Sequence, residues 1–131
     1  HLSIRRQRQM CIRDRFHMII MVFEYWLDEA HQEEYMQHAA ILRQLVRSID
    51  GFLSIERFRS ESDPDKILAL GYFRDEEAVK RWRNIPAHRQ AQLLGRDRLF
   101  IDYHLCIAEV RRDYTKQDRG EAPNDSLGLQ N

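Results

Sequence analysis

The sequence predicts an α+β domain of the ferredoxin-like class, in which a four-stranded antiparallel sheet has its helices on one face. Strand-like segments rich in β-branched and aromatic residues alternate with amphipathic segments in the order β-α-β-β-α-β. The chain has 131 residues, which is enough for one domain with a hydrophobic core and too few for two. Right-handed crossovers then place both helical segments on the same face of the sheet.

The first strand and the first helix are predicted within residues 19–50. Residues 19–27 (IIMVFEYWL) are apolar and largely β-branched or aromatic, which is typical of a buried strand. Asp28 follows and can cap a long helix, whose apolar side chains recur at three- and four-residue spacing over four turns. We expect this helix to end at Asp50 and Gly51, with Gly51 as the first residue after it.

A hairpin and a second helical segment follow in the chain. Residues 53–60 alternate between apolar and polar, the turn sequence ESDPD comes next, and residues 66–74 predict the third strand. Asp75 can cap a short helix. Pro86 starts another helix, because the residue before a proline is pushed out of the α region. Residues 99–110 predict the fourth strand.

The predicted first, third and fourth strands are apolar on both faces. In the first strand, for example, Ile20 and Val22 alternate with Met21, Phe23 and Tyr25. Strands of this kind must be covered on both faces, and the two helical segments can cover only one. A second copy of the chain is the economical cover for the other face. The sequence therefore predicts a homodimer that joins sheet to sheet.

The two ends of the chain are expected to lie outside the domain. Residues 1–15 contain five arginines and one acid, and most of this segment back-translates to a sequence that resembles a transposase adapter of sequencing libraries. We therefore expect residues 1–17 to be a non-native, disordered leader, with the gene product beginning near Met18. Residues 115–131 are polar and are expected to form a disordered tail. The domain would then span residues 18–114.

Charge and cysteine content exclude several classes of protein. Without residues 1–15 the chain has 16 basic and 20 acidic residues, and an acidic domain repels a phosphate backbone. No apolar run approaches the roughly 20 residues of a membrane span. With two cysteines and no visible export signal, we expect a cytoplasmic protein without nucleic-acid or membrane partners. No metal-ligand spacing or glycine-rich phosphate loop occurs in the sequence, so no metal and no cofactor is expected.

His88 is the strongest candidate for a catalytic residue. It is expected about three residues into the helix that begins at Pro86, where the helix dipole disfavours the imidazolium form. A neutral imidazole can act as a general base, while helix capping or solvent contact is the alternative role. Trp82 either packs in the core or forms a pocket wall with its N–H toward a substrate oxygen. Asn84 is either another donor or a turn former.

Four further residues are candidates for binding a substrate: Tyr72, Arg96, Tyr103 and His104. Arg96 could hold an oxyanion, and a surface or interface charge is the alternative. The two tyrosines and His104 lie on predicted strands, facing either the helices or the interior of a dimeric barrel. His104 interrupts an apolar face, either as a satisfied core histidine or as a polar group of a cavity. Cys106 has no nearby base and is expected to be a buried structural thiol.

Two turns and three longer segments carry a family resemblance: Gly51-Phe52, Ser62-Asp63-Pro64, YFRDEEAVKRWRN (72–84), PAHRQAQLLGR (86–96) and AEVRRDY (108–114). With these features, the chain from Met18 to about Tyr114 resembles the antibiotic biosynthesis monooxygenase (ABM) domain family. The resemblance implies a ferredoxin-like domain that dimerises through its sheet into an α/β barrel. It implies less about chemistry, because the family contains enzymes with different substrates and members without an assigned reaction.

Enzymes of the resembled family include cofactor-independent oxygenases of phenols and anthrones, quinol monooxygenases and haem-degrading monooxygenases. The haem-degrading members have an asparagine where this chain has Tyr25 and a haem-ligating histidine near Gln92, so only their tryptophan matches, at Trp82. The resemblance thus favours a cofactor-independent monooxygenase that uses O₂ on a small electron-rich aromatic or quinol, with His88 as the base. A non-catalytic dimeric module that binds a small hydrophobic molecule is the alternative.

Overall fold

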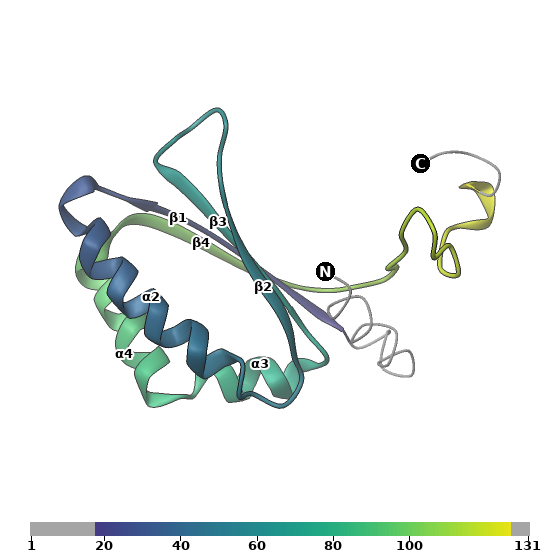
Figure 1. Ribbon diagram of the computed structural model, residues 1–131, viewed down its shortest axis with the longest axis horizontal. Coiled ribbons are helices and arrows are strands. Elements are labelled where there is room, and N and C mark those ends of the chain that lie inside the picture. The colour runs from purple at the N-terminus through teal and green to yellow at the C-terminus, as the bar shows by residue number, and fades with distance from the viewer. Residues whose placement is uncertain (1–17, 127–131) are drawn as a thin grey trace.

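Four antiparallel strands form the centre of the molecule, and the helices that connect them lie on one face of the sheet (Figure 1). The structure is a computed structural model that describes residues 18–126, so the predicted leader and the last five residues of the predicted tail lie outside the described residues. In chain order the elements are β1 (Ile19–Leu27), a 3-10 turn (Glu29–His31), α2 (Gln32–Val46), β2 (Phe52–Arg59), β3 (Lys66–Phe73), α3 (Glu76–Arg83), α4 (Pro86–Leu94), a π-helical turn (Gly95–Leu99), β4 (Phe100–Glu109) and a 3-10 turn (Asn124–Ser126). The predicted β-α-β-β-α-β order and the antiparallel sheet are confirmed.

The strand order is β2-β3-β1-β4, and all three pairings are antiparallel. Each observed strand begins and ends within one residue of its predicted range. The pairing register places Arg57, Ala69, Phe23 and Leu105 in one row across the four strands. The side chains of this row face the helices. Because side chains alternate along a strand, every second residue of each strand, counted from this row, faces the helices as well.

Asp75 caps α3, as the sequence predicts, whereas Asp28 caps the 3-10 turn and α2 begins after His31 without a side-chain cap. The carboxylate of Asp28 accepts a hydrogen bond from the backbone N–H of His31 (3.1 Å), and that of Asp75 accepts one from Ala78 (2.9 Å). The Asp75 cap satisfies an amide that has no partner inside its own helix. Among the helices of the described residues, none combines the length and the apolar character needed to cross a membrane.

The helix α2 ends at Val46, about one turn earlier than predicted. The backbone N–H groups of Ser48 and Ile49 donate to carbonyls three residues back, and the Ser48 hydroxyl donates to the Leu45 carbonyl (2.7 Å). These short-range bonds tighten the chain out of the α-helix. Gly51 therefore lies in the turn before β2 and is not the residue that follows the helix. Its φ of 93° is in the left-handed region that favours glycine.

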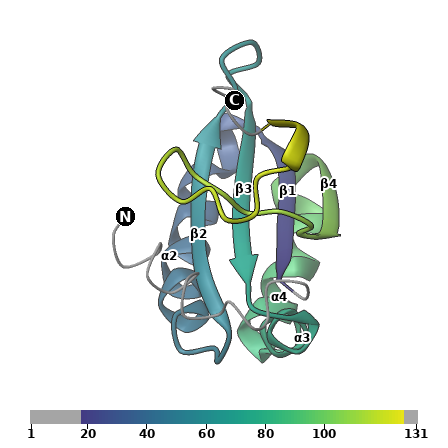
Figure 2. The ribbon, with the colours of Figure 1, turned by 90° about the vertical axis from the view of Figure 1, so that its right-hand side faces the viewer.

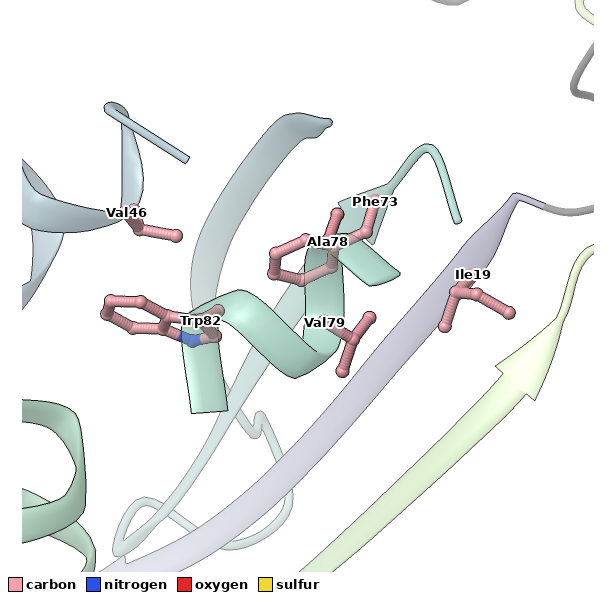
Figure 3. Packing of buried hydrophobic residues seen from close by; sticks show 6 residues of the cluster. All are labelled: Ile19, Val46, Phe73, Ala78, Val79 and Trp82. Atoms are coloured by element: carbon pink, nitrogen blue, oxygen red, sulfur yellow. The ribbon is translucent and has the colours of Figure 1, made fainter. Parts of the chain in front are cut away.

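The hydrophobic core lies on the helix face of the sheet and contains two clusters of buried residues. The first consists of Ile19, Val46, Phe73, Ala78, Val79 and Trp82 (Figure 3). The second consists of Tyr25, Leu27, Ala69 and Leu99. In Figure 3, α3 directs Ala78 and Val79 toward the sheet, while Trp82 lies next to Val46 of α2. Through these two clusters, α2 and the α3-α4 segment pack against the sheet.

The opposite, outer face of the sheet has no helical cover in the part of the chain that the structure describes (Figure 2). Its apolar residues on β1 and β3 are half-buried: Ile20, Val22, Trp26, Leu68, Leu70 and Tyr72. Residues 110–126 leave β4 on the side away from the helices (Figures 1 and 2). Cys106 is exposed, so the expectation of a buried thiol is wrong for the single chain, because β4 is an edge strand and Cys106 faces outward.

Candidate functional site

A cavity of about 430 Å³ lies between the helices and the sheet. The sheet contributes apolar residues such as Met21 and Phe23, and α2 contributes others such as Leu42. Helix α4 and the turn after it close another side with residues that include Ala91 and Leu99. A concave, mostly apolar space with a few polar groups is the usual form of a site for a small organic molecule.

Four of the seven predicted site residues line this cavity: Trp82, His88, Arg96 and Tyr103. They come from α3, from α4, from the turn after α4 and from β4. The sequence places them up to 21 positions apart, and the fold brings them around one space.

The other three predicted site residues lie elsewhere. Asn84 is exposed, and its side-chain oxygen accepts a hydrogen bond from Arg89 (2.6 Å) at the junction of α3 and α4. Tyr72 lies on β3 and faces the outer side of the sheet. His104 lies on the outer face of β4, where its Nδ1 is 3.1 Å from a carboxylate oxygen of Glu24. The sheet thus separates Tyr72 and His104 from the cavity.

The rings of Trp82 and His88 stack on each other inside the site. Their centroids are 4.2 Å apart and their planes differ by 26°. In one continuous α-helix, residues six positions apart point about 120° away from each other. The interruption before Pro86 removes this constraint, because it ends α3 at Arg83 and starts α4 in a new direction. The predicted break in the helix is therefore what lets the two rings meet.

His88 is neutral at pH 7 in this environment. Burial of the ring lowers the pKa of His88 below its ordinary value, and the nearby charge of Arg89 lowers it further. The backbone carbonyl groups of Arg83 and Trp82 oppose this effect on the pKa without reversing it. Burial, rather than the helix dipole that the sequence suggested, is the largest cause. The Nδ1 atom is buried and has no hydrogen-bond partner among the described residues.

Sequence reasoning missed a polar group of Tyr25, Tyr35 and Arg57 on the helix face of the sheet. The Tyr35 hydroxyl donates to the Tyr25 hydroxyl (2.8 Å), and the Arg57 guanidinium interacts with both phenols. Burial raises the pKa of Tyr25, so that this phenol stays protonated. Arg57 and Tyr35 line the cavity. One signal was available, because Arg57 continues the alternating face of Leu53 and Ile55 in the second strand.

The cavity offers an apolar space, a neutral imidazole and several cations. Arg57, Arg89 and Arg96 line it together with His38 and His88. Such a site can accept a proton from a bound organic molecule and stabilise the oxyanion that forms. Within residues 18–126, no group of three or more His, Cys, Asp or Glu side chains is arranged to hold a metal ion.

Comparison with solved structures shows which fold the chain shares. SnoaB, a cofactor-independent oxygenase from Streptomyces nogalater solved as a mutant, is similar with a TM-score of 0.63 and 15% identity, over 74% of this chain and 96% of that one. A conserved protein from Methanosarcina mazei Go1 is similar with a TM-score of 0.66 and 13% identity, over 75% of this chain and 97% of that one. At these identities the likeness concerns the fold alone.

Comparison of sequences identifies a related protein and a matching family model. A jasmonate monooxygenase of Pyricularia oryzae is 38% identical to this chain over 93 residues, which are 71% of this chain. The matched part is 43% of that relative, so this chain spans less than half of the relative's length. The family model described as antibiotic biosynthesis monooxygenase matches residues 18–93, which contain the first three strands and the residues Trp82 and His88. The chain belongs to the antibiotic biosynthesis monooxygenase family.

Proposed function

We propose that this chain is a cofactor-independent monooxygenase that acts on a small electron-rich aromatic or quinol substrate in the cavity between α4 and the sheet. The stacked pair of Trp82 and His88 carries the proposal, because it presents a neutral imidazole at the wall of an apolar cavity. Membership of the monooxygenase family and a relative named as a monooxygenase support it. So does the similarity in fold to a cofactor-independent oxygenase.

In the first step, His88 removes a proton from a phenol or from a carbon activated by the aromatic system. The imidazole is unprotonated at pH 7, as a general base must be. The negative charge that forms is spread over the substrate's oxygen and carbon atoms. The indole N–H of Trp82 and the guanidinium of Arg96 are the proposed donors to that oxygen. Apolar walls exclude water, which strengthens these interactions.

In the second step, the substrate carbanion transfers one electron to O₂. The substrate radical and superoxide then combine into a peroxide, which takes up the proton that His88 holds. Loss of water leaves a carbonyl group on the carbon, so that R₂CH₂ and O₂ become R₂C=O and H₂O. One oxygen atom enters the product and the other enters water. The substrate carbon supplies all four electrons, so no external reductant is needed.

Oxygen consumption by the full chain tests the proposed function. The panel consists of hydroquinones, anthrones and jasmonate, which is included because the relative from Pyricularia oryzae is named for it. We expect consumption of O₂ without added cofactor, and ¹⁸O₂ should place one labelled atom in the product. Binding without turnover across the panel would refute the monooxygenase and favour the non-catalytic binding module.

A pair of variants locates the reaction. Ala91→Trp fills the cavity from α4 and should abolish turnover, because Ala91 lines the cavity. Ala40→Trp places the same bulk on the exposed side of α2 and should leave turnover unchanged. Turnover that survives Ala91→Trp would place the chemistry outside this cavity.

We also propose that the chain forms a homodimer through the outer face of its sheet. Leu68, Leu70 and Val22 give this face an apolar centre, and residues 110–126 extend on the same side. An apolar surface on both sides of one sheet supports a second protein layer. An identical chain is the simplest such layer, since a two-fold axis lets one face cover itself.

A further inference from the structure

Arg57 is placed on the helix face of the sheet, at the cavity. Its register partner on β3 is Ala69, and Phe23 of β1 is next in the same row. Both neighbours are apolar, and Tyr35 of α2 lines the same cavity. The Nε atom of Arg57 is buried and has no hydrogen-bond partner among residues 18–126. A strong donor is thus held at the cavity with part of its hydrogen-bonding capacity unused.

The charge of Arg57 has no counter-charge in the described part of the protein. Ion pairs found there use other cations, such as Lys66, Arg74 and Arg98. The polar neighbours of Arg57 are the hydroxyls of Tyr25 and Tyr35. Neutral hydroxyls solvate a guanidinium but do not neutralise it, and a partly buried cation without an anion is unfavourable. An anionic ligand would remove this cost.

The other charged residues at the cavity have the same sign of charge as Arg57. Three arginines line it, Arg57 among them, and no aspartate or glutamate is among its described lining residues. This contrasts with the chain after residue 15, in which acidic residues outnumber basic ones by four. Positive charge is therefore concentrated at a cavity of an otherwise acidic protein, and such a distribution attracts anions.

The register also relates the position of Arg57 to that of the Trp82–His88 pair. Ile55 and Met21 each lie two residues along their strand from the row of Arg57, a distance of about 7 Å. Both residues pack against the cluster that contains Trp82, and Trp82 stacks on His88. The guanidinium of Arg57 and the imidazole of His88 thus lie at different places along the same cavity, so a ligand that reaches both has an extended body.

We propose that the cavity binds an amphipathic monocarboxylate, with its carboxylate on Arg57 and its apolar or aromatic body extending toward His88. A guanidinium matches the planar shape of a carboxylate and can donate two parallel hydrogen bonds to it. This proposal deepens the proposed function, because it takes the same cavity as the substrate site. It adds that the substrate has an anionic end away from the reacting atoms.

Calorimetric titration of the full chain with 4-phenylbutyrate and with its neutral isostere 4-phenylbutyramide tests the proposal. The wild-type chain should bind the carboxylate about 10- to 100-fold more tightly than the amide. Arg57→Met should remove this preference, chiefly by weakening the binding of the carboxylate, and Arg57→Lys should restore part of it. Arg59→Met is the matched control, because Arg59 is an exposed cation of the same strand that does not line the cavity, and it should bind both ligands like the wild type.

Two results would overturn the carboxylate site. One is a wild-type chain that does not prefer the carboxylate to the amide. The other is an Arg57→Met variant that has a much lower melting temperature but an unchanged preference per folded molecule, which would make Arg57 a structural residue. The proposed function fails separately: a preference that depends on Arg57, without oxygen consumption by any substrate, leaves the anion site standing and refutes the monooxygenase.

Discussion

Trp82 and His88 are six residues apart in the chain, and their rings stack because the helix between them is interrupted. Trp82 is 5% exposed and belongs to the core cluster with Val46, yet it also lines the cavity. The sequence left two positions open for Trp82, one in the core and one at a pocket wall. In the structure the side chain packs in the core and also lines the cavity. The indole N–H of Trp82 and the imidazole of His88 are the groups of this pair that can take part in the proposed reaction.

Replacing Trp82 by phenylalanine separates packing from hydrogen bonding. The smaller ring can still pack against Val46 and His88, but the N–H is lost. We expect kcat to fall by about 10-fold or more, because a donor to a developing oxyanion contributes this much, while the melting temperature falls by a few degrees. Trp26→Phe is the control, since the Trp26 N–H donates to Asp63 (3.0 Å) outside the cavity. A large loss of stability with normal kcat per folded molecule would make Trp82 a core residue only.

The lowered pKa of His88 predicts how stability depends on pH. In the unfolded chain this imidazole titrates near its ordinary value of about 6.5, whereas the folded protein keeps it neutral to lower pH. Below about pH 6.5 the unfolded chain therefore binds a proton that the folded protein does not, and the free energy of unfolding decreases. Urea unfolding between pH 7.5 and 5.5 should show this decrease, and His88→Gln should reduce it. An identical slope in both proteins would contradict the burial of His88.

At the scale of single elements, the turn between α2 and β2 depends on one glycine. Gly51 has a φ of 93°, and a Cβ added there would lie 2.7 Å from the Cβ of Ala78 on α3. The first feature strains any L side chain, and the second forces α3 to move. This turn therefore sets how closely α3 approaches the sheet.

Gly51→Ala should lower the free energy of unfolding by about 1 kcal/mol or more, measured by urea unfolding. Gly120→Ala is the matched control, because its added Cβ would be 3.7 Å from the nearest side chain, that of Asp118, which is ordinary contact. The control should change stability by less than about 0.5 kcal/mol. Equal effects of the two substitutions would show that the strain at Gly51 is absent.

The elements that the sequence predicts well are those that local chemistry determines. The first, third and fourth strands follow from apolar runs, the second strand follows from its alternation, and the break before Pro86 follows from proline geometry. The early end of α2 was missed because it depends on the hydrogen bond from the Ser48 hydroxyl to the Leu45 carbonyl. The sequence of this segment is equally compatible with one more turn of helix. Arg57 was missed although it continues the alternating face of Leu53 and Ile55, because the register against β3 is needed to place that face at the cavity.

On the scale of the whole molecule, the sheet separates two surfaces of different character. One face holds the core and the cavity, and the other is an apolar surface with Cys106 and His104 at the edge strand β4. The sequence predicted two apolar faces but could not assign Tyr72 and His104 to one of them. That assignment requires the pairing of β1 with β3 and β4, which is long-range information.

The proposed dimer predicts a single particle of twice the subunit mass in light scattering, with about 1,600 Å² or more of buried surface. Leu70→Asp places a charge at the centre of the outer face and should yield monomers. Met36→Asp is the control, because Met36 is 57% exposed on α2, and it should remain dimeric. A wild-type monomer at micromolar concentration would refute the dimer.

If His88 is the base of the reaction in this cavity, as we propose, the kcat of the His88→Ala variant must fall. Oxygen consumption is measured with the panel substrate that the wild-type chain turns over fastest, and thermal unfolding is measured on the same samples. We expect kcat to fall by about 10²–10⁴-fold, the usual contribution of a positioned base, with a melting temperature within a few degrees of wild type. His88→Gln, which retains more of the side-chain volume, should lose kcat equally. An unchanged kcat per folded molecule in both variants would contradict the claim.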